Sequence, residues 1–203
     1  MSVQLSLYLK EGTKSTHDQA ETSDFQRRLA NAEISRKAYA DYIGQLYLVH
    51  SALEKGLAGD ARTKEIADPA QFQAEFLARD LNELGIDTTK IEPLPSTKRM
   101  LASIAENAKS HPLGLIGYHY VLLGSKHGGK YIAAQVRKKF DFDGAGCLYF
   151  DPYGTNFQSI WAQFKSNLDG VTADESDGAA VLQSAKEMFN YVGELGHDLS
   201  SVE

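Results

Sequence analysis

The feature that most constrains the fold of this chain is the recurrence of apolar residues every three or four positions along most of its length. A helix needs this spacing if one stripe of its side chains is to face a core. The clearest stripe consists of Tyr39, Ile43, Leu46, Val49, Leu53 and Leu57. No segment shows a convincing strand ladder with alternating polar and apolar residues. The sequence therefore predicts an all-α fold.

Residues typical of helix ends agree with this periodicity. Serine and aspartate are good N-caps, proline suits the first turn, and glycine often follows the last turn. A threonine followed three positions later by glutamate is the pattern of a capping box. The residues that carry these signals are Ser35, Asp68 with Pro69, Gly85, Ser96, and the pair Thr172 and Glu175. They predict about seven or eight helices, with one running from Asp68 to Gly85.

Composition limits the class of protein. A chain of 203 residues with 42% hydrophobic and 24% charged side chains suits one globular domain, which we expect to span residues 1–203 as a monomer. The net charge of −6 argues against nucleic acid as the main partner. The lone Cys147 excludes an internal disulfide and a cysteine-rich metal site. Without a signal sequence or a membrane span, we expect a soluble, cytoplasmic protein.

A first group of chemically active residues lies near the N-terminus, where residues 9–21 read LKEGTKSTHDQAE. On one helix, their spacing places Lys10, Lys14, His17 and Glu21 along one side. A neutral imidazole is a good axial ligand for haem iron, and a ligating histidine usually donates its other ring N–H to an acceptor. His17 is therefore the candidate ligand, Glu21 the candidate acceptor, and the lysines candidate partners of haem propionates. A solvated helix with a chance histidine is the alternative.

A second group is the apolar run LGLIGYHYVLLGSKHGGKYIAAQVRKKF at residues 113–140, which Gly124, Gly128 and Gly129 interrupt. Each glycine costs a helix roughly 1 kcal/mol relative to alanine. Three such residues close together indicate a kink, or a flat ligand lying against bare backbone. Close packing between helices is the alternative explanation. No strand precedes the run, so it does not match a dinucleotide-binding fingerprint.

These two segments and a third, FQSIWAQFKSNLD, which is predicted to be helical from Asn156 to Leu168, resemble the haem oxygenases in order and spacing. The resemblance extends from about Leu9 to about Asp169. It implies that haem b, as both cofactor and substrate, lies between an N-terminal proximal helix and a glycine-kinked distal helix. It also implies oxidation of haem by O2 to biliverdin, carbon monoxide and free iron. The electrons would come from a donor such as a ferredoxin or a flavin reductase.

The resemblance assigns roles to individual positions. The proximal iron ligand of the family falls on His17, and the glutamate one turn later falls on Glu21. The distal glycines fall on Gly124, Gly128 and Gly129. The basic residues that hold the propionates fall on Lys10, Lys14 and Lys165.

Two positions depart from the family pattern. Many members carry aspartate after the first distal glycine, where it orders water near bound oxygen, but this chain has Ser125. We expect Ser125 to share that catalytic role with backbone groups at Gly124 and Gly128. His127 stands where serine or an apolar residue is more usual, and an inward-turned imidazole would give a six-coordinate haem. The YVL before Gly124-Ser125, and the PYG at 152–154, are similar to the bacterial branch associated with phytochrome chromophore synthesis.

Two other functions remain open at this point. A haem carrier would bind haem without oxidising it, which the missing distal aspartate permits. A non-haem di-iron oxidase of similar fold would use His50, Glu54 and His119. A ferritin-like site needs paired Glu-x-x-His motifs, and the chain offers only the one ending at His197.

Overall fold

The protein is seen in a computed structural model that describes residues 4–21 and 23–200, without the side chain of Glu21. Every regular element in this range is a helix, which confirms the predicted all-α fold. Eleven α-helices and five short 3-10 helices are present in the described ranges, more than the sequence predicted. The α-helices are α1 (Leu5–Gly12), α2 (Lys14–Glu21), α3 (Asp24–Ala30), α4 (Arg36–Leu57), α5 (Ala61–Ile66), α6 (Ala74–Glu83), α7 (Pro95–Ser110), α8 (Leu115–Gly124), α9 (Lys126–Phe140), α10 (Phe157–Gly170) and α11 (Glu175–Ser200). The 3-10 helices are η1 (Pro69–Gln71), η2 (Thr88–Lys90), η3 (Pro112–Gly114), η4 (Leu148–Phe150) and η5 (Gly154–Asn156).

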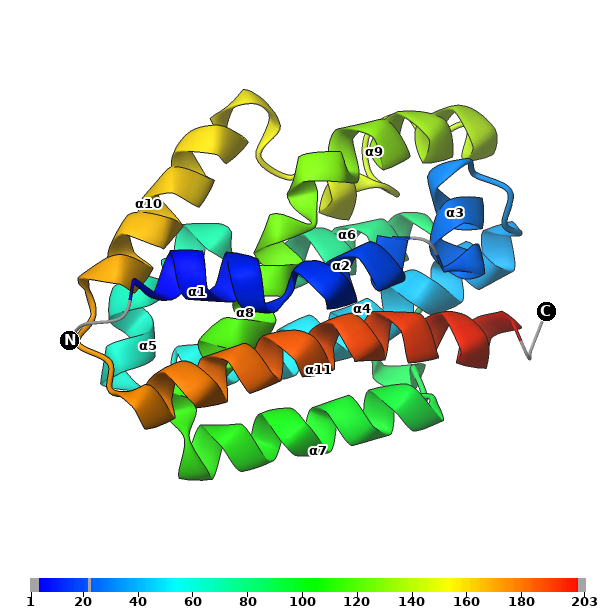
Figure 1. The fold of residues 1–203 in the computed structure, drawn as a ribbon. Helices are drawn as coiled ribbons and strands as arrows, with labels where there is room; N and C mark the ends of the chain where they lie inside the picture. The colour runs from blue at the N-terminus through cyan, green and yellow to red at the C-terminus, as the bar shows by residue number, and fades with distance from the viewer. Residues whose placement is uncertain (1–3, 22, 201–203) are drawn as a thin grey trace.

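The C-terminal helix α11 is the element on which much of the molecule is assembled. It packs against α8 and α7, and also against the N-terminal helices α1, α2 and α3 (Figure 1). Its contact with α8 is backbone to backbone, because a Cβ added at Gly117 would overlap the carbonyl oxygen of Val181. A Cβ at Gly12 of α1 would likewise lie 2.6 Å from Leu182 Cδ1. Glycine therefore sets how closely two helices approach α11.

The long helix α4 carries the apolar stripe predicted from sequence. All six of its members are buried, from Tyr39 to Leu57. The helix begins as predicted, because the Ser35 side chain accepts a hydrogen bond from the backbone N–H of Ala38 at 3.0 Å. Here the local pattern and the tertiary fold agree.

The next helix starts differently from the prediction. Asp68 and Pro69 open only the short η1, and α6 begins at Ala74. Its cap comes from another helix, because Glu54 Oε1 accepts hydrogen bonds from the backbone N–H groups of Gln73 at 2.6 Å and Ala74 at 3.0 Å. The prediction of one helix from Asp68 was therefore wrong, although Gly85 does follow α6 with a positive φ of 75°.

Two further helices begin one or two residues away from their predicted starts. The helix α7 begins at Pro95, one residue before Ser96. The predicted capping box of Thr172 and Glu175 is wrong, since Asp174 and Asp177 carry the reciprocal hydrogen bonds, with Asp177 N–H donating to Asp174 Oδ1 at 2.8 Å.

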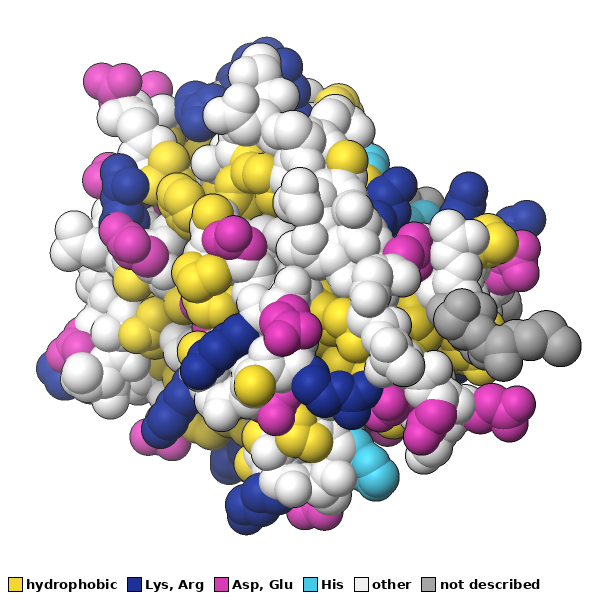
Figure 2. All heavy atoms as spheres, turned by 90° about the vertical axis from the view of Figure 1, so that its left-hand side faces the viewer, with side chains coloured by type: hydrophobic (Ala, Val, Ile, Leu, Met, Phe, Trp, Pro, Cys, Tyr) yellow, Lys and Arg dark blue, Asp and Glu magenta, His cyan; other side chains and the backbone are white. Residues whose placement is uncertain are grey.

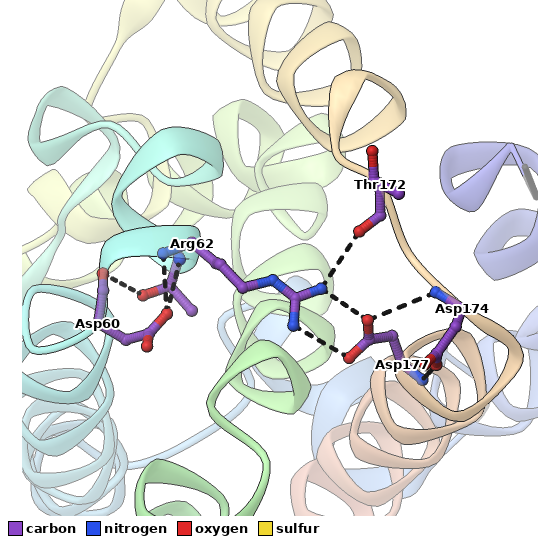
Figure 3. Close-up of polar contacts among 6 residues, drawn as sticks. Asp60, Arg62, Thr172, Asp174 and Asp177 are labelled. Carbon is purple, nitrogen blue, oxygen red and sulfur yellow. Dashed lines mark hydrogen bonds and ion pairs between the residues drawn. The ribbon is translucent and has the colours of Figure 1, made fainter.

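The same Asp177 ties α11 to α5. Figure 3 shows the guanidinium of Arg62 reaching Asp177 Oδ2 at 2.6 Å and the Thr172 carbonyl oxygen at 3.3 Å. The hydrogen bond from Arg62 lowers the pKa of Asp177. Asp60 starts α5 by accepting from the N–H groups of Arg62 and Thr63. Arg62 already holds the Asp177 carboxylate at this end of α11. This pairing explains why Asp177, and not Glu175, completes the cap.

The loop after α9 is fixed by one buried carboxylate. Asp80 of α6 is fully buried, and it accepts from the backbone N–H groups of Gly146, Leu148 and Tyr149 at 2.8 to 2.9 Å. Burial raises the pKa of Asp80, and these three hydrogen bonds act in the opposite direction. Their effect on structure is to hold η4 in place beneath α9.

The surface carries both signs of charge. On the face drawn in Figure 2, basic side chains are interspersed with acidic ones, and apolar groups lie between them. No helix in the described residues is long and apolar enough to span a membrane.

The close contact between α8 and α11 gives a first prediction. Gly117→Ala should lower the free energy of unfolding by roughly 1–3 kcal/mol, because the new methyl group must push the backbone at Val181 away. The measurement is a urea titration followed by circular dichroism.

Gly193→Ala is the matched control in α11, since no neighbouring element has an atom within 4 Å of a Cβ at that position. This variant should match the unmodified protein or be more stable than it. Equal stability of the two variants would contradict the packing argument.

Candidate functional site

The N-terminal group of predicted residues lies on two short helices, not on one. Lys10 is in the last turn of α1, and Lys14 and His17 belong to α2, with Thr13 between the helices. The helical path continues across the break, since Thr13 N–H donates to Leu9 O at 3.0 Å and His17 N–H donates to Thr13 O at 2.9 Å. The predicted spacing is therefore largely kept. Glu21 ends α2, and its side chain lies outside the described part of the chain.

His17 lies at the surface of α2 and contacts α11. Its side chain is 50% exposed, and its Nδ1 lies 3.5 Å from Asp18 Oδ1. The ring packs edge-on against Phe189 of α11, with a centroid distance of 5.7 Å. One side of the imidazole is thus supported by the protein, while half of the side chain stays accessible.

The start of α1 is anchored to the end of α10. Asp169 accepts hydrogen bonds from the N–H of Ser6 at 2.8 Å and from its hydroxyl at 2.6 Å. Because α1 also packs against α10, Lys10 and Lys165 come from neighbouring helices. The Lys165 Nζ lies 5.9 Å from the ring centroid of Trp161.

The glycine-rich run breaks at Ser125. α8 ends at Gly124 and α9 begins at Lys126, so the run does contain the predicted interruption. The Ser125 hydroxyl donates to the carbonyl oxygen of Leu122 at 2.8 Å. Although Ser125 is exposed, its only hydroxyl proton is thus directed back at the helix.

The three glycines of this run have different surroundings. Gly128 is exposed, and no atom lies within 4 Å of an added Cβ. A Cβ at Gly124 would lie 3.5 Å from the indole ring of Trp161. Gly129 instead faces Phe150, whose carbonyl oxygen would overlap an added Cβ. Close packing therefore accounts for this glycine, and the contact of Gly129 with a ligand stays a prediction.

His127 packs against α10. Its Nδ1 lies 2.8 Å from the carbonyl oxygen of Gly124. Its ring lies edge-on to Phe157 at 4.7 Å and to Trp161 at 5.3 Å between centroids. These contacts hold the imidazole against the aromatic side chains of α10, so the structure offers no support for a second axial histidine.

A buried lysine beside the break was not among the residues predicted from the sequence. Lys126 is only 6% exposed, and its Nζ lies 3.1 Å from the centroid of the Tyr149 ring. Burial lowers the pKa of Lys126 well below its usual value. The helical spacing of buried residues could have indicated that Lys126 is buried. Lys126 lies four residues after the buried Leu122 and three before the buried Gly129.

The residues of the di-iron alternative do not form a metal site. Glu54 caps α6 through Oε1, and His119 Nε2 lies 3.0 Å from Gln71 Oε1. Glu194, of the motif ending at His197, pairs with Arg99 at 2.6 Å. No group of three potential ligands gathers in residues 4–21 and 23–200, so the di-iron alternative is not supported.

A surface hollow of about 600 Å³ lies along the N-terminal helices. Its lining residues are Glu11, Lys14, Ser15, Asp18 and Gln19. Of the predicted binding residues, only Lys14 is among them.

Comparison with known sequences gives a consistent result. The family model for "Heme oxygenase" matches residues 3–198. A heme oxygenase from Guillardia theta is 28% identical over 200 residues, covering 94% of this chain and 84% of that protein. Heme oxygenase 1 of Gallus gallus is 27% identical and covers 93% of this chain and 67% of that protein.

Solved structures of heme oxygenases have the same fold as this chain. Heme oxygenase-2 from Synechocystis sp. PCC 6803, solved in complex with heme and NO, superposes with a TM-score of 0.91 at 23% identity. The match covers 98% of this chain and 86% of that one.

The buried histidine of α8 gives a prediction about acid stability. Burial lowers the pKa of His119 from 6.5 to about 3. Between these values the unfolded chain holds a proton that the folded chain does not, so His119 makes stability fall as the pH drops from 6.5 towards 3. The slope approaches roughly 1.4 kcal/mol per pH unit for one such group.

His119→Gln should therefore flatten the fall in the free energy of unfolding over this pH range, as measured by urea titrations at several pH values. His127→Gln, which changes an exposed histidine nearby, is the control and should leave the profile unchanged. Parallel profiles for His119→Gln and the unmodified protein would show that burial of this imidazole is not the cause.

Proposed function

The chain belongs to the heme oxygenase family, and we propose that it binds haem and opens the porphyrin ring with O2 and reducing equivalents. The products are biliverdin, carbon monoxide and free iron. The observation that carries this proposal is the family match over residues 3–198, together with the histidine and the broken glycine run in one helical fold.

The local structure fits a flat ligand. Gly128 presents exposed backbone with open space where a Cβ would stand, and the flat face of a macrocycle needs such a surface. Gly124, half-buried beside it on the other side of the break, has only the Trp161 ring near its Cβ position. α8, which leads into the break, and α2, which carries His17, both pack on α11 (Figure 1).

We assign the proximal side to α1 and α2. Haem supplies the iron and the conjugated ring on which O2 reacts. His17 binds the iron through its neutral imidazole, and an acceptor such as Glu21 or Asp18 orients the ring by taking the other N–H. Lys10 and Lys14 are exposed and within two turns before His17, where their ammonium groups pair with propionates. Lys165 contributes from the neighbouring α10.

We assign the distal side to the break around Ser125. Its hydroxyl donates to Leu122 O, so towards the pocket the oxygen acts mainly as an acceptor for water. Unlike a carboxylate, it brings no charge. Water held by Ser125 and by backbone groups at Gly124 and Gly128 therefore carries the proton, which gives slow but real turnover.

The remaining partners follow from the chemistry. The reaction consumes electrons, which a donor must supply. We therefore propose an external donor such as a ferredoxin or a flavin reductase, acting on a monomeric, cytoplasmic protein. A haem carrier would bind haem without converting it to biliverdin. One experiment therefore separates a carrier from a haem oxygenase.

That experiment adds haemin, a reductant and air to the purified protein and records the absorption spectrum. The Soret band should appear on binding and then give way to biliverdin absorption. His17→Ala should lose the native Soret spectrum and regain part of it with added imidazole.

His111→Ala is the control for that variant, because His111 is exposed at the end of α7. Its spectrum should match that of the unmodified protein. An unchanged ferric spectrum in His17→Ala would rule out the assigned ligand, and a stable Soret band without biliverdin would favour the carrier.

The two adjacent glycines of α9 give a paired prediction. Gly128→Phe should keep the stability of the haem-free protein but weaken haemin binding by at least about tenfold, because the ring fills the space proposed for haem. Gly129→Ala should instead destabilise the haem-free protein by roughly 1–3 kcal/mol through overlap with Phe150.

Haemin titration and urea titration of both variants provide the test. If Gly128→Phe binds haemin as tightly as the unmodified protein, this face of α9 is not the distal surface.

A further inference from the structure

The tryptophan of this chain stands beside the helix break. Trp161 belongs to α10, and its indole ring would lie 3.5 Å from a Cβ added at Gly124, the last residue of α8. The side chain is half-buried, so the ring is not sealed inside the core. Trp161 therefore forms part of the wall on the Gly124 side of the break.

The ring neighbours of Trp161 differ in how easily they lose an electron. Phe157 and Phe164 stack on the indole at 6.5 and 5.5 Å between centroids, and His127 meets it edge-on at 5.3 Å. Benzene and imidazole rings are much harder to oxidise than indole, so these three cannot take over an oxidation from Trp161. Among the described residues, the remaining ring neighbour is Tyr120, at 5.4 Å between centroids. A phenol, unlike the other three rings, is readily oxidised by one electron.

Tyr120 connects Trp161 with the surface. It lies on α8, one turn before Gly124, and its side chain is half-buried. Its hydroxyl makes no hydrogen bond to a described residue, yet it is not among the buried side-chain atoms that lack a partner, so it reaches solvent. The two oxidisable rings therefore form a short path from the break to water.

We propose that Trp161 and Tyr120 form a relay that carries a one-electron oxidation from the pocket wall at Gly124 to the protein surface. The proposal rests on the proposed function, which places haem at this wall. A peroxide that reaches the iron there, in place of O2 and a reductant, produces a strong oxidant. A site of this kind has to exclude such competing reactions, and the relay moves the oxidation away before it damages the groups that line the pocket.

The electrons and protons of the relay balance. Trp161 gives one electron to the oxidant and its indole N–H proton to water, which leaves a neutral indolyl radical. Tyr120 then passes one electron to this radical and releases its phenol proton to water, while the indole nitrogen regains a proton. A reductant in solution, such as ascorbate or a thiol, restores Tyr120. Reduction of hydrogen peroxide to water takes two electrons and two protons, so one peroxide molecule drives the relay twice.

The direction of transfer follows from the same chemistry. When an electron and a proton leave together at neutral pH, a phenol is easier to oxidise than an indole, so the radical moves from Trp161 to Tyr120. The Lys165 Nζ, 5.9 Å from the centroid of the Trp161 ring, adds to this preference. Its charge disfavours a second positive charge on the indole, so the oxidised ring loses its proton and does not persist as a cation.

The haem-free protein provides the first test. Azide radicals made by pulse radiolysis oxidise indole faster than phenol, so they place the radical first on Trp161. The visible band of the indolyl radical should decay at a rate independent of protein concentration, and the band of the phenoxyl radical should rise at the same rate. Tyr120→Phe should abolish this coupled decay and rise, because it removes only the phenol O–H.

Tyr131→Phe is the matched control, since Tyr131 is 57% exposed on the neighbouring helix α9 and is not a ring neighbour of Trp161. The coupled kinetics should persist in this variant. Coupled kinetics that also persist in Tyr120→Phe, or that are absent from the unmodified protein, would overturn the relay.

The haemin complex provides the second test. The ferric complex is mixed with hydrogen peroxide and a spin trap, without reductant, and mass spectrometry of its peptides locates the adduct. The adduct should lie on Tyr120 in the unmodified protein and on Trp161 in Tyr120→Phe. In Trp161→Phe the adduct on Tyr120 should be lost, because phenylalanine fills the same stack but does not relay an electron. An adduct on Tyr120 that survives in Trp161→Phe would show that the oxidation takes another path.

The outcomes separate this inference from the proposed function. Biliverdin formation from haemin, O2 and a reductant, combined with no transfer from Trp161 to Tyr120, would reject the relay and leave the function intact. If the unmodified protein does not bind haemin, the proposed function is rejected, and with it the pocket as the source of the oxidation, even where the haem-free protein shows transfer between the two rings.

Discussion

The buried carboxylate of Asp80 is the interaction on which the distal half of the proposed site depends. By accepting from the N–H groups of Gly146, Leu148 and Tyr149, it replaces the hydrogen bonds that an irregular buried segment would otherwise lack. The segment so fixed places the Phe150 carbonyl against Gly129 and the Tyr149 ring beneath Lys126. One side chain on α6 therefore holds the segment against which the first turn of α9 packs.

How much the sequence predicts depends on whether the deciding contact is local. The α4 stripe and its Ser35 cap are correct because both are encoded within a few residues. The start of α6 is missed because its cap, Glu54, belongs to another helix nineteen positions earlier. The start of α11 is missed because two capping pairs compete within a few residues, and the outcome is tied to Arg62.

The distinction between local and distant contacts applies to the proposed site as well. The sequence locates the histidine and the glycine run, since both are short motifs. It does not tell Gly128 from Gly129, because the difference is which side of α9 meets the Phe150 backbone. Nor does it reveal that the Ser125 hydroxyl is used by Leu122, or that a lysine is buried at the adjacent position. The surroundings of Gly129 and of Lys126 depend on the loop that Asp80 holds, which is distant in sequence.

The position of Trp161 has a consequence for studying the protein. It is the only tryptophan in the chain, and its indole lies against the Gly124 side of the helix break, among the rings of Tyr120, His127 and Phe164. Its ultraviolet emission therefore originates from one known place beside the proposed pocket. Arrival of a porphyrin, which absorbs in the emission range of indole, would be reported by energy transfer from this single native fluorophore. The molecule carries its own optical probe for occupancy, and no label has to be introduced.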